Sequence, residues 1–114
     1  MTEARDAGST DRSPDTDGEG YIVDPAEWTE AFAEAAAREE GIVLTDAHWE
    51  VIRFMRQWLE EHAVTPDARH VMKLIGGDDR DAGRARLFEL FPLGYVKQAC
   101  RIAGMKRPRA WSTG

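Results

Sequence analysis

Apolar side chains recur at spacings of three and four residues over most of the chain, the pattern of helices with one buried face. The pattern predicts helices over residues 25–40, 46–62, 66–75, 84–91 and 93–103. Residues that commonly start or stop a helix lie at their ends: Asp24, Pro25, Gly41, Thr45, Thr65, Pro66, Gly76, Pro92 and Gly104. The second helix is apolar around too much of its circumference for a single contact. We therefore expect it at the centre of a small orthogonal helical bundle.

The first and last predicted helices each carry one apolar face. On the first helix it consists of Trp28, Ala31, Phe32 and Ala35. On the last helix it consists of Val96, Ala99, Cys100 and Ala103. Between the third and fourth helices, the polar sequence GGDDRDAGR predicts a loop, because glycine and aspartate are poor helix formers.

The two ends of the chain differ from the helical body. Residues 1–19 contain one large apolar side chain, Met1, and are predicted to be disordered because they cannot bury enough surface. Residues 21–23 are β-prone and predict a strand or one half of a short hairpin. Residues 105–114 predict an extended arm, since Pro108 disfavours a helix just before it. The sequence thus predicts a mainly α-helical domain over residues 20–104, between an acidic disordered segment and a mobile basic arm.

Charge is spread unevenly along the 114 residues. The net charge is −6 at pH 7, yet residues 91–114 carry five basic and no acidic side chains. Such an arm can dock on its own body, on an acidic partner or on a phosphate backbone, and charge alone does not choose between them. No apolar run is long enough for a membrane span, and the first residues lack the features of a signal peptide. We therefore expect a cytoplasmic protein.

Cys100 is the only cysteine, so no intrachain disulfide can form. Two interpretations of it are open: it packs as a small hydrophobe, or it is a nucleophile whose thiolate is favoured by Lys97 and Arg101. The negative C-terminal end of the helix dipole opposes a thiolate there. The histidines show no metal or triad spacing and are expected at the surface: His48, His62 and His70. We expect no metal and no cofactor.

The helices at 46–62 and 66–75 are separated by three residues, a spacing typical of a helix-turn-helix. Arg69, His70 and Lys73 would then face a DNA groove. The arm adds three cations that phosphates would attract: Lys106, Arg107 and Arg109. Asp67 opposes phosphate, however, and the packing of two core helices explains the same pattern. Trp111 on the arm predicts a groove that it fills, on the body or on a partner.

Three segments carry a resemblance to a known family: GYIVDPAEWTEAFAEAAAREEGIVLTDAHWEVIRFMRQWLEEH, TPDARHVMKLIG and LFELFPLGYVKQACRIAGMKRP. Over about residues 17–109 the chain resembles the DsrC/TusE sulfur-carrier proteins, which include the gamma-subunit-like partner of dissimilatory sulfite reductase. The resemblance implies a mostly helical fold with an N-terminal hairpin and a mobile C-terminal arm. It also implies sulfur carriage, as a persulfide or trisulfide, on a cysteine next to the C-terminus. Some members have a second cysteine eleven residues earlier.

Cys100 matches that second cysteine, and the position of the carrier cysteine holds Trp111, whose indole cannot form a persulfide. Two function hypotheses follow. The first, which we favour, is a non-catalytic binding or regulatory protein of sulfur metabolism, whose arm docks on a sulfite reductase or a sulfurtransferase, with DNA as a further partner. Its partner-binding residues would be Trp111, Arg109, Arg107, Lys106, Arg101 and Lys97. The alternative is a sulfur carrier that uses Cys100 as its persulfide site. For either we expect a monomer without membrane attachment.

Overall fold

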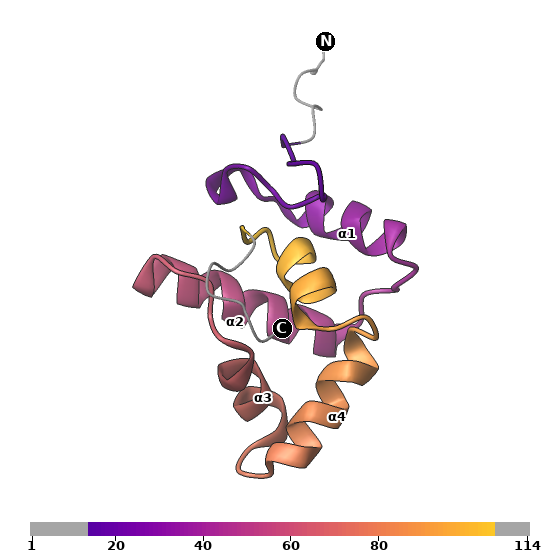
Figure 1. Ribbon diagram of the computed structural model, residues 1–114, viewed down its shortest axis with the longest axis vertical. Helices are drawn as coiled ribbons and strands as arrows, with labels where there is room; N and C mark the ends of the chain where they lie inside the picture. Colours follow the sequence, from indigo (N-terminus) through magenta and orange to yellow (C-terminus); the bar gives the residue numbers. More distant parts are fainter. Residues whose placement is uncertain (1–13, 107–114) are drawn as a thin grey trace.

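The computed structural model describes residues 14–106 and confirms the mainly helical class. A 3₁₀ turn η2 (Pro25–Glu27) precedes four α-helices and a final π-helical segment, which are α1 (Glu30–Glu39), α2 (Asp46–His62), α3 (Ala68–Gly76), α4 (Arg80–Leu90) and η3 (Tyr95–Cys100). Figure 1 shows α2 crossing the middle of the molecule, with α1 on one side and α3 and α4 on the other. η3, coloured yellow, lies between α1 and α2 (Figure 1).

The central helix α2 has the bounds that the sequence predicts. Thr45 and His48 form a capping box at its start, with the imidazole Nδ1 3.0 Å from the Thr45 backbone nitrogen. Val51, Ile52 and Met55 on this helix are fully buried. His48 is buried as well, so its predicted place at the surface is wrong. Its Nε2 lies 2.8 Å from the carbonyl oxygen of Leu90, which ties α2 to the end of α4.

α1 begins later than the sequence predicts and turns a different face to the core. Asp24 and Pro25 start only the 3₁₀ turn, and the α-helix begins at Glu30 because the Thr29 hydroxyl accepts the Phe32 amide at 3.1 Å. The buried alanines of α1 are Ala33, Ala36 and Ala37, whereas Ala31 and Ala35 are exposed. Trp28 and Phe32 of the predicted apolar face are half-buried against the core, so only Ala31 and Ala35 were wrongly placed. The late start, with Trp28 outside the helix, changes which alanines share the buried side.

α3 and α4 also differ from the prediction at their ends. Asp67, rather than Thr65, caps α3, and Asp79 caps α4, so the connecting loop shortens to residues 77–79. The loop prediction failed at Gly83, which lies inside α4 in spite of its low helix propensity. A Cβ on Gly83 would lie 2.4 Å from the Met72 carbonyl oxygen, so the glycine lets the two helix backbones approach closely. α3 packs far more extensively on α4 than on α2.

The N-terminal turn contains a single antiparallel bridge between Thr16 and Ile22, and residues 14–106 form no strand. The predicted strand at 21–23 is therefore wrong, because the two sides share one bridge, flanked by the backbone bonds from Val23 to Asp15 at 2.9 Å and from Asp17 to Tyr21 at 2.8 Å. The Asp17 carboxylate also accepts the Tyr21 amide at 3.0 Å. Most of the segment predicted to be disordered, residues 1–13, lies outside the described residues.

η3 begins at Tyr95, after Gly94 at φ 103°, and the helical path ends at Gly104 at φ 75°. Ala99, Cys100 and Ala103 of its apolar stripe are buried and Val96 is half-buried. Gln98 and Ile102 are buried as well. The Met105 side chain is also buried completely, and its amide donates to the Cys100 carbonyl at 2.9 Å. Met105, predicted as the first residue of the arm, therefore belongs to the packed body, and residues 107–114 lie outside the described residues.

Candidate functional site around Cys100

Cys100 is the one sulfur nucleophile of the chain, and its side chain is completely buried. Burial raises the pKa of the thiol from 9.0 to about 12, while a hydrogen bond with Tyr95 acts weakly in the opposite direction. Burial also raises the pKa of Tyr95, whose hydroxyl donates to the Pro66 carbonyl. The thiol is therefore neutral at physiological pH and has no direct path to solvent.

The two cations that the sequence placed beside this thiol do not activate it. Lys97 is exposed on the outer side of η3. The Arg101 guanidinium is turned toward α1, where it forms ion pairs with Glu39 and Glu40. Neither contributes to the pKa of Cys100, which depends on burial and on Tyr95.

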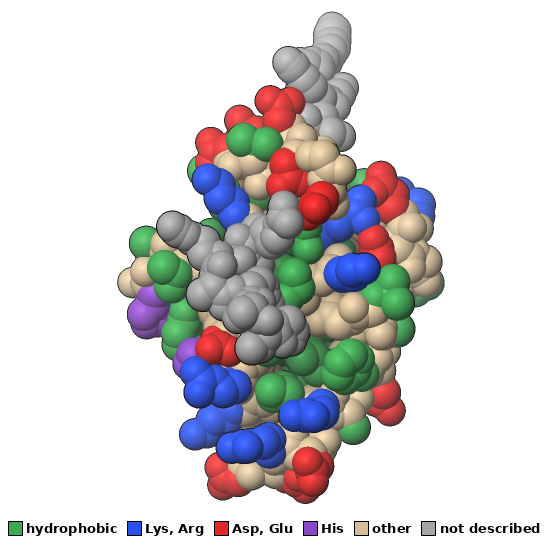
Figure 2. Space-filling view, viewed as in Figure 1, with side chains coloured by type: hydrophobic (Ala, Val, Ile, Leu, Met, Phe, Trp, Pro, Cys, Tyr) green, Lys and Arg blue, Asp and Glu red, His purple; other side chains and the backbone are tan. Residues whose placement is uncertain are grey.

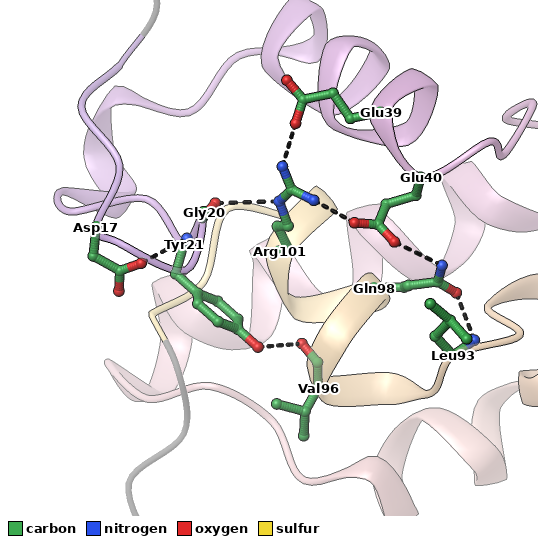
Figure 3. A network of polar contacts seen from close by, with 9 residues as sticks. All are labelled: Asp17, Gly20, Tyr21, Glu39, Glu40, Leu93, Val96, Gln98 and Arg101. Atoms are coloured by element: carbon green, nitrogen blue, oxygen red, sulfur yellow. Dashed lines mark hydrogen bonds and ion pairs between the residues drawn. The ribbon is translucent and has the colours of Figure 1, made fainter.

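Arg101 is the centre of a polar network that joins three parts of the chain (Figure 3). Its Nε donates to the Gly20 carbonyl at 3.3 Å, so the N-terminal turn, α1 and η3 meet at one guanidinium. Gln98 extends the network, because its amide donates to Glu40 at 2.9 Å and its carbonyl oxygen accepts the Leu93 amide at 2.8 Å. Arg101 was predicted to bind a partner, and in this structure its hydrogen bonds are made within the chain.

A second arginine, Arg56, binds the backbone at the end of the last helical segment. Arg56 of α2 donates from one nitrogen to the carbonyls of Ala103 and Gly104, at 3.1 Å each, and from another to Pro25 at 2.9 Å. Its guanidinium carbon lies 4.7 Å from the centre of the Trp28 ring. The Trp28 indole in turn donates to the Ile102 carbonyl at 2.9 Å. These groups satisfy carbonyls that the end of a helix leaves unpaired.

Sequence reasoning missed Arg56 and gave Trp28 only a packing role. The partners of their side chains lie between 28 and 74 residues away along the chain. The only signal in the sequence was that Arg56 follows apolar residues on the central helix. That signal does not indicate which groups the arginine binds.

Arg69, His70 and Lys73, the predicted DNA-contacting residues, lie together on α3. Arg69 is exposed and pairs with Asp67 at 3.0 Å, and Lys73 is exposed in the last turn. His70 is half-buried, because its ring packs against Trp58 of α2 at a centroid distance of 4.3 Å and a tilt of 34°.

Of the arm residues predicted to bind a partner, Lys106 is exposed, and Arg107, Arg109 and Trp111 lie outside the described residues. Residues 14–106 contain no group of three His, Cys, Asp or Glu side chains placed to hold a metal ion. Within the same range no helix has both the length and the apolar character needed to cross a bilayer.

A family model described as "DsrC like protein" matches residues 9–110, which is most of the chain. The chain belongs to the DsrC-like family. The sulfurtransferase TusE of Pectobacterium atrosepticum is 42% identical over 96 residues, covering 82% of this chain and 87% of that relative. TusE of Salmonella typhimurium is also 42% identical, over 95 residues, with the same shares.

Two solved structures of this DsrC-like family share the fold. One is the oxidized gamma-subunit of the dissimilatory sulfite reductase (DsrC) from Archaeoglobus fulgidus, with a TM-score of 0.75, 35% identity and coverage of 87% of this chain and 92% of that one. The other is the NMR structure of Allochromatium vinosum DsrC, with a TM-score of 0.72, 34% identity and coverage of 84% and 88%. The resemblance stated from the sequence is confirmed.

Proposed function

We propose that this DsrC-like protein works in sulfur relay by binding other proteins of the relay, and that Cys100 is a packing residue in its folded state. Membership of the family and the sulfurtransferase relatives support the sulfur-relay part of the proposal. The burial of Cys100 supports the binding part. With a pKa of about 12, roughly 10⁻⁵ of the thiol would be ionised at pH 7, and only the thiolate attacks a sulfur donor.

The sequence of the arm supports the same proposal. Trp111 stands eleven residues after Cys100, where the resemblance places the carrier cysteine, and the chain has no other thiol. An indole offers a large apolar surface and one hydrogen-bond donor, which are properties of residues that anchor interfaces. Arg56 and Trp28 fix the backbone of residues 102–104, which come shortly before the arm in the sequence.

A second candidate function is sulfur transfer with Cys100 as the persulfide site. The name of the relatives, sulfurtransferase, favours it over a purely regulatory role. It requires a movement of η3 that exposes the thiol and lowers its pKa. DNA binding, a monomeric state and a cytoplasmic location remain predictions from the sequence, and the names of the relatives above do not refer to DNA.

The two candidates are separated by loading the folded protein with an inorganic polysulfide and measuring its intact mass. In loading, a thiolate attacks a terminal sulfur of the polysulfide. A new S–S bond forms on the cysteine while an S–S bond of the donor breaks, and the donor leaves as a shorter polysulfide anion. We expect no sulfur adduct on the parent protein or on Cys100→Ser, and one added sulfur on Trp111→Cys.

The Trp111→Cys variant is the positive control, because it restores a thiol at the position of the family's carrier cysteine. An adduct on the parent protein that is absent from Cys100→Ser and blocked by prior alkylation would establish the second candidate instead. Partner binding is tested separately by quantifying the proteins captured from a lysate by the parent and by Trp111→Ala. An equal yield from both would show that the arm is not the anchor.

A further inference from the structure

A groove lies between α2 and α3, on the opposite side of α2 from α1. It has a volume of about 480 Å³ and is lined by Phe54, Arg69, His70, Lys73 and Leu74. We call it the α2–α3 groove. Figure 2 shows Lys and Arg side chains gathered over the lower part of the molecule, where α3 and α4 lie in Figure 1. A pocket of this size accepts one or two side chains of a bound molecule.

An aromatic row on α2 begins at Phe54, which lines the groove. Phe54, Trp58 and His62 follow each other at intervals of four residues on α2, so they lie on one side of that helix. The Trp58 ring contacts Phe54 at a centroid distance of 5.8 Å, His62 at 4.1 Å and His70 at 4.3 Å. The rings of Phe54, Trp58 and His70 are half-buried and that of His62 is exposed, so part of this aromatic surface is accessible to solvent. Partly exposed aromatic side chains are enriched where proteins bind one another.

His70 supplies a polar atom that has no partner within residues 14–106. Its Nδ1 is buried and makes no hydrogen bond there. A buried polar atom without a partner is costly, so a rotation of the imidazole that brings Nδ1 to the groove would be favoured by a ligand with a hydrogen-bonding group.

The rim of the groove is cationic, although the chain as a whole is acidic. Lys73 is exposed and makes no ion pair with any residue in the range 14–106. Arg69 pairs only with Asp67, and both side chains are largely exposed, at 80% and 46%. A pair so open to solvent is weak, and Arg69 can turn to a ligand carboxylate at little cost.

We propose that the α2–α3 groove is a docking site for an acidic peptide segment of a partner protein, with a large apolar side chain next to its carboxylates. The apolar side chain lies between Phe54 and Leu74, and the carboxylates meet Lys73 and Arg69. The proposal deepens the proposed function, since it names a surface on which a relay partner is recognised.

Three other occupants fit the groove less well. Nucleic acid fits less well, because its affinity grows with each phosphate that is neutralised. The groove itself supplies only Arg69 and Lys73, and Arg69 is paired with Asp67. The chain's own arm is basic, with Arg107 and Arg109 and no acidic side chain, so it is repelled by this rim. A second copy of the chain would bring an acidic surface but no segment that the structure shows to match the groove.

The test is to select short random peptides displayed on phage against the full-length protein, and then to measure binding of the recovered peptides by fluorescence anisotropy. The variant is Lys73→Glu, and the matched control is Arg38→Glu. Both residues are exposed basic side chains in the last turn of a helix, and both substitutions change the net charge equally. We expect peptides with carboxylates beside a large apolar residue, bound about tenfold or more weakly by Lys73→Glu and unchanged by Arg38→Glu.

Several results would overturn the proposal: no recovered peptide, recovered peptides without carboxylates, or equal weakening by the two variants. Displacement of the peptide by a duplex oligonucleotide would assign the groove to nucleic acid. Tighter peptide binding by Trp111→Ala would show that the arm fills the groove. A dimer that Lys73→Glu dissociates would assign it to a second copy. Because peptide binding needs no sulfur chemistry, failure here is distinct from failure of the polysulfide experiment.

Discussion

Gly104, at the point where the arm leaves the body, is the position where one added methyl group should do most damage. Its φ is +75°, and a Cβ there would lie 2.2 Å from Cδ1, 2.6 Å from Cγ and 2.8 Å from Cβ of Trp28. Two of these atoms are close to the Trp28 backbone, so the ring cannot simply swing aside. Gly104→Ala should therefore push Trp28 out of its place between Arg56 and the end of the last helix.

The expected loss has three parts. Alanine in a left-handed conformation costs about 1 kcal/mol relative to glycine. Displacing Trp28 breaks its hydrogen bond to the Ile102 carbonyl, worth about 1 kcal/mol, and its contact with Arg56, worth about another 1 kcal/mol. The free energy of unfolding should thus fall by about 3 kcal/mol, which lowers Tm by more than about 10 °C for a domain of this size.

Gly41→Ala is the control, because Gly41 has the same backbone conformation, at φ +74°, and no atom lies within 4 Å of the place that an added methyl group would occupy. It should lose only the conformational part, about 1 kcal/mol. Urea unfolding of the two variants and the parent, followed by circular dichroism, measures the difference. If Gly104→Ala loses no more free energy than Gly41→Ala, the Trp28 contact does not hold the base of the arm and the reasoning fails.

Two further predictions concern the site. Because the pKa of Cys100 is raised by folding, the unfolded chain releases its thiol proton above about pH 9 while the folded chain keeps it until about pH 12. Between pH 9 and pH 12 the free energy of unfolding of the parent should therefore fall by about 1.4 kcal/mol more per pH unit than that of Cys100→Ala. If the two free energies fall in parallel as the pH rises, the prediction is contradicted. Glu40→Gln should cost about 2 kcal/mol in urea unfolding and Glu39→Gln less than about 0.5, because the Glu40 side chain is 16% exposed and that of Glu39 65%. Equal losses of unfolding free energy in the two variants would show that burial of the Glu40–Arg101 pair does not contribute to stability.

The sequence was sufficient to predict helix bounds where the signals that set them are local. α2 has its predicted bounds because Thr45 caps it and its apolar surface is wide enough to pack on several sides. The start of α1 was misread because Asp24 and Thr29 are both good caps, and tertiary contacts of Trp28 decide between them. Gly83 was read as a loop residue because its helical role depends on the close approach of another helix, which its own neighbours in the sequence do not reveal.

For the site, sequence reasoning identified the residue but not its surroundings. The apolar spacing on the last helix pointed to a packed Cys100 and left its activation open. The partners that turn Arg101 away from the thiol are Glu39 and Glu40, some 60 residues earlier in the chain. No local pattern predicts such a pairing. The family resemblance added the role of the arm cysteine, and with it the significance of Trp111.

The central claim is that the Cys100 thiol is inaccessible to reagents in the folded protein. The rate at which Cys100 is alkylated tests this claim most directly. Iodoacetamide labelling at pH 7, followed by intact-mass spectrometry, should be at least about a thousandfold slower for the folded protein than for the protein in urea. The pKa rise from 9.0 to about 12 alone removes that much thiolate, and burial adds to it. Labelling of the folded protein at a rate close to that of the unfolded chain would contradict the claim and make Cys100 available as a sulfur carrier.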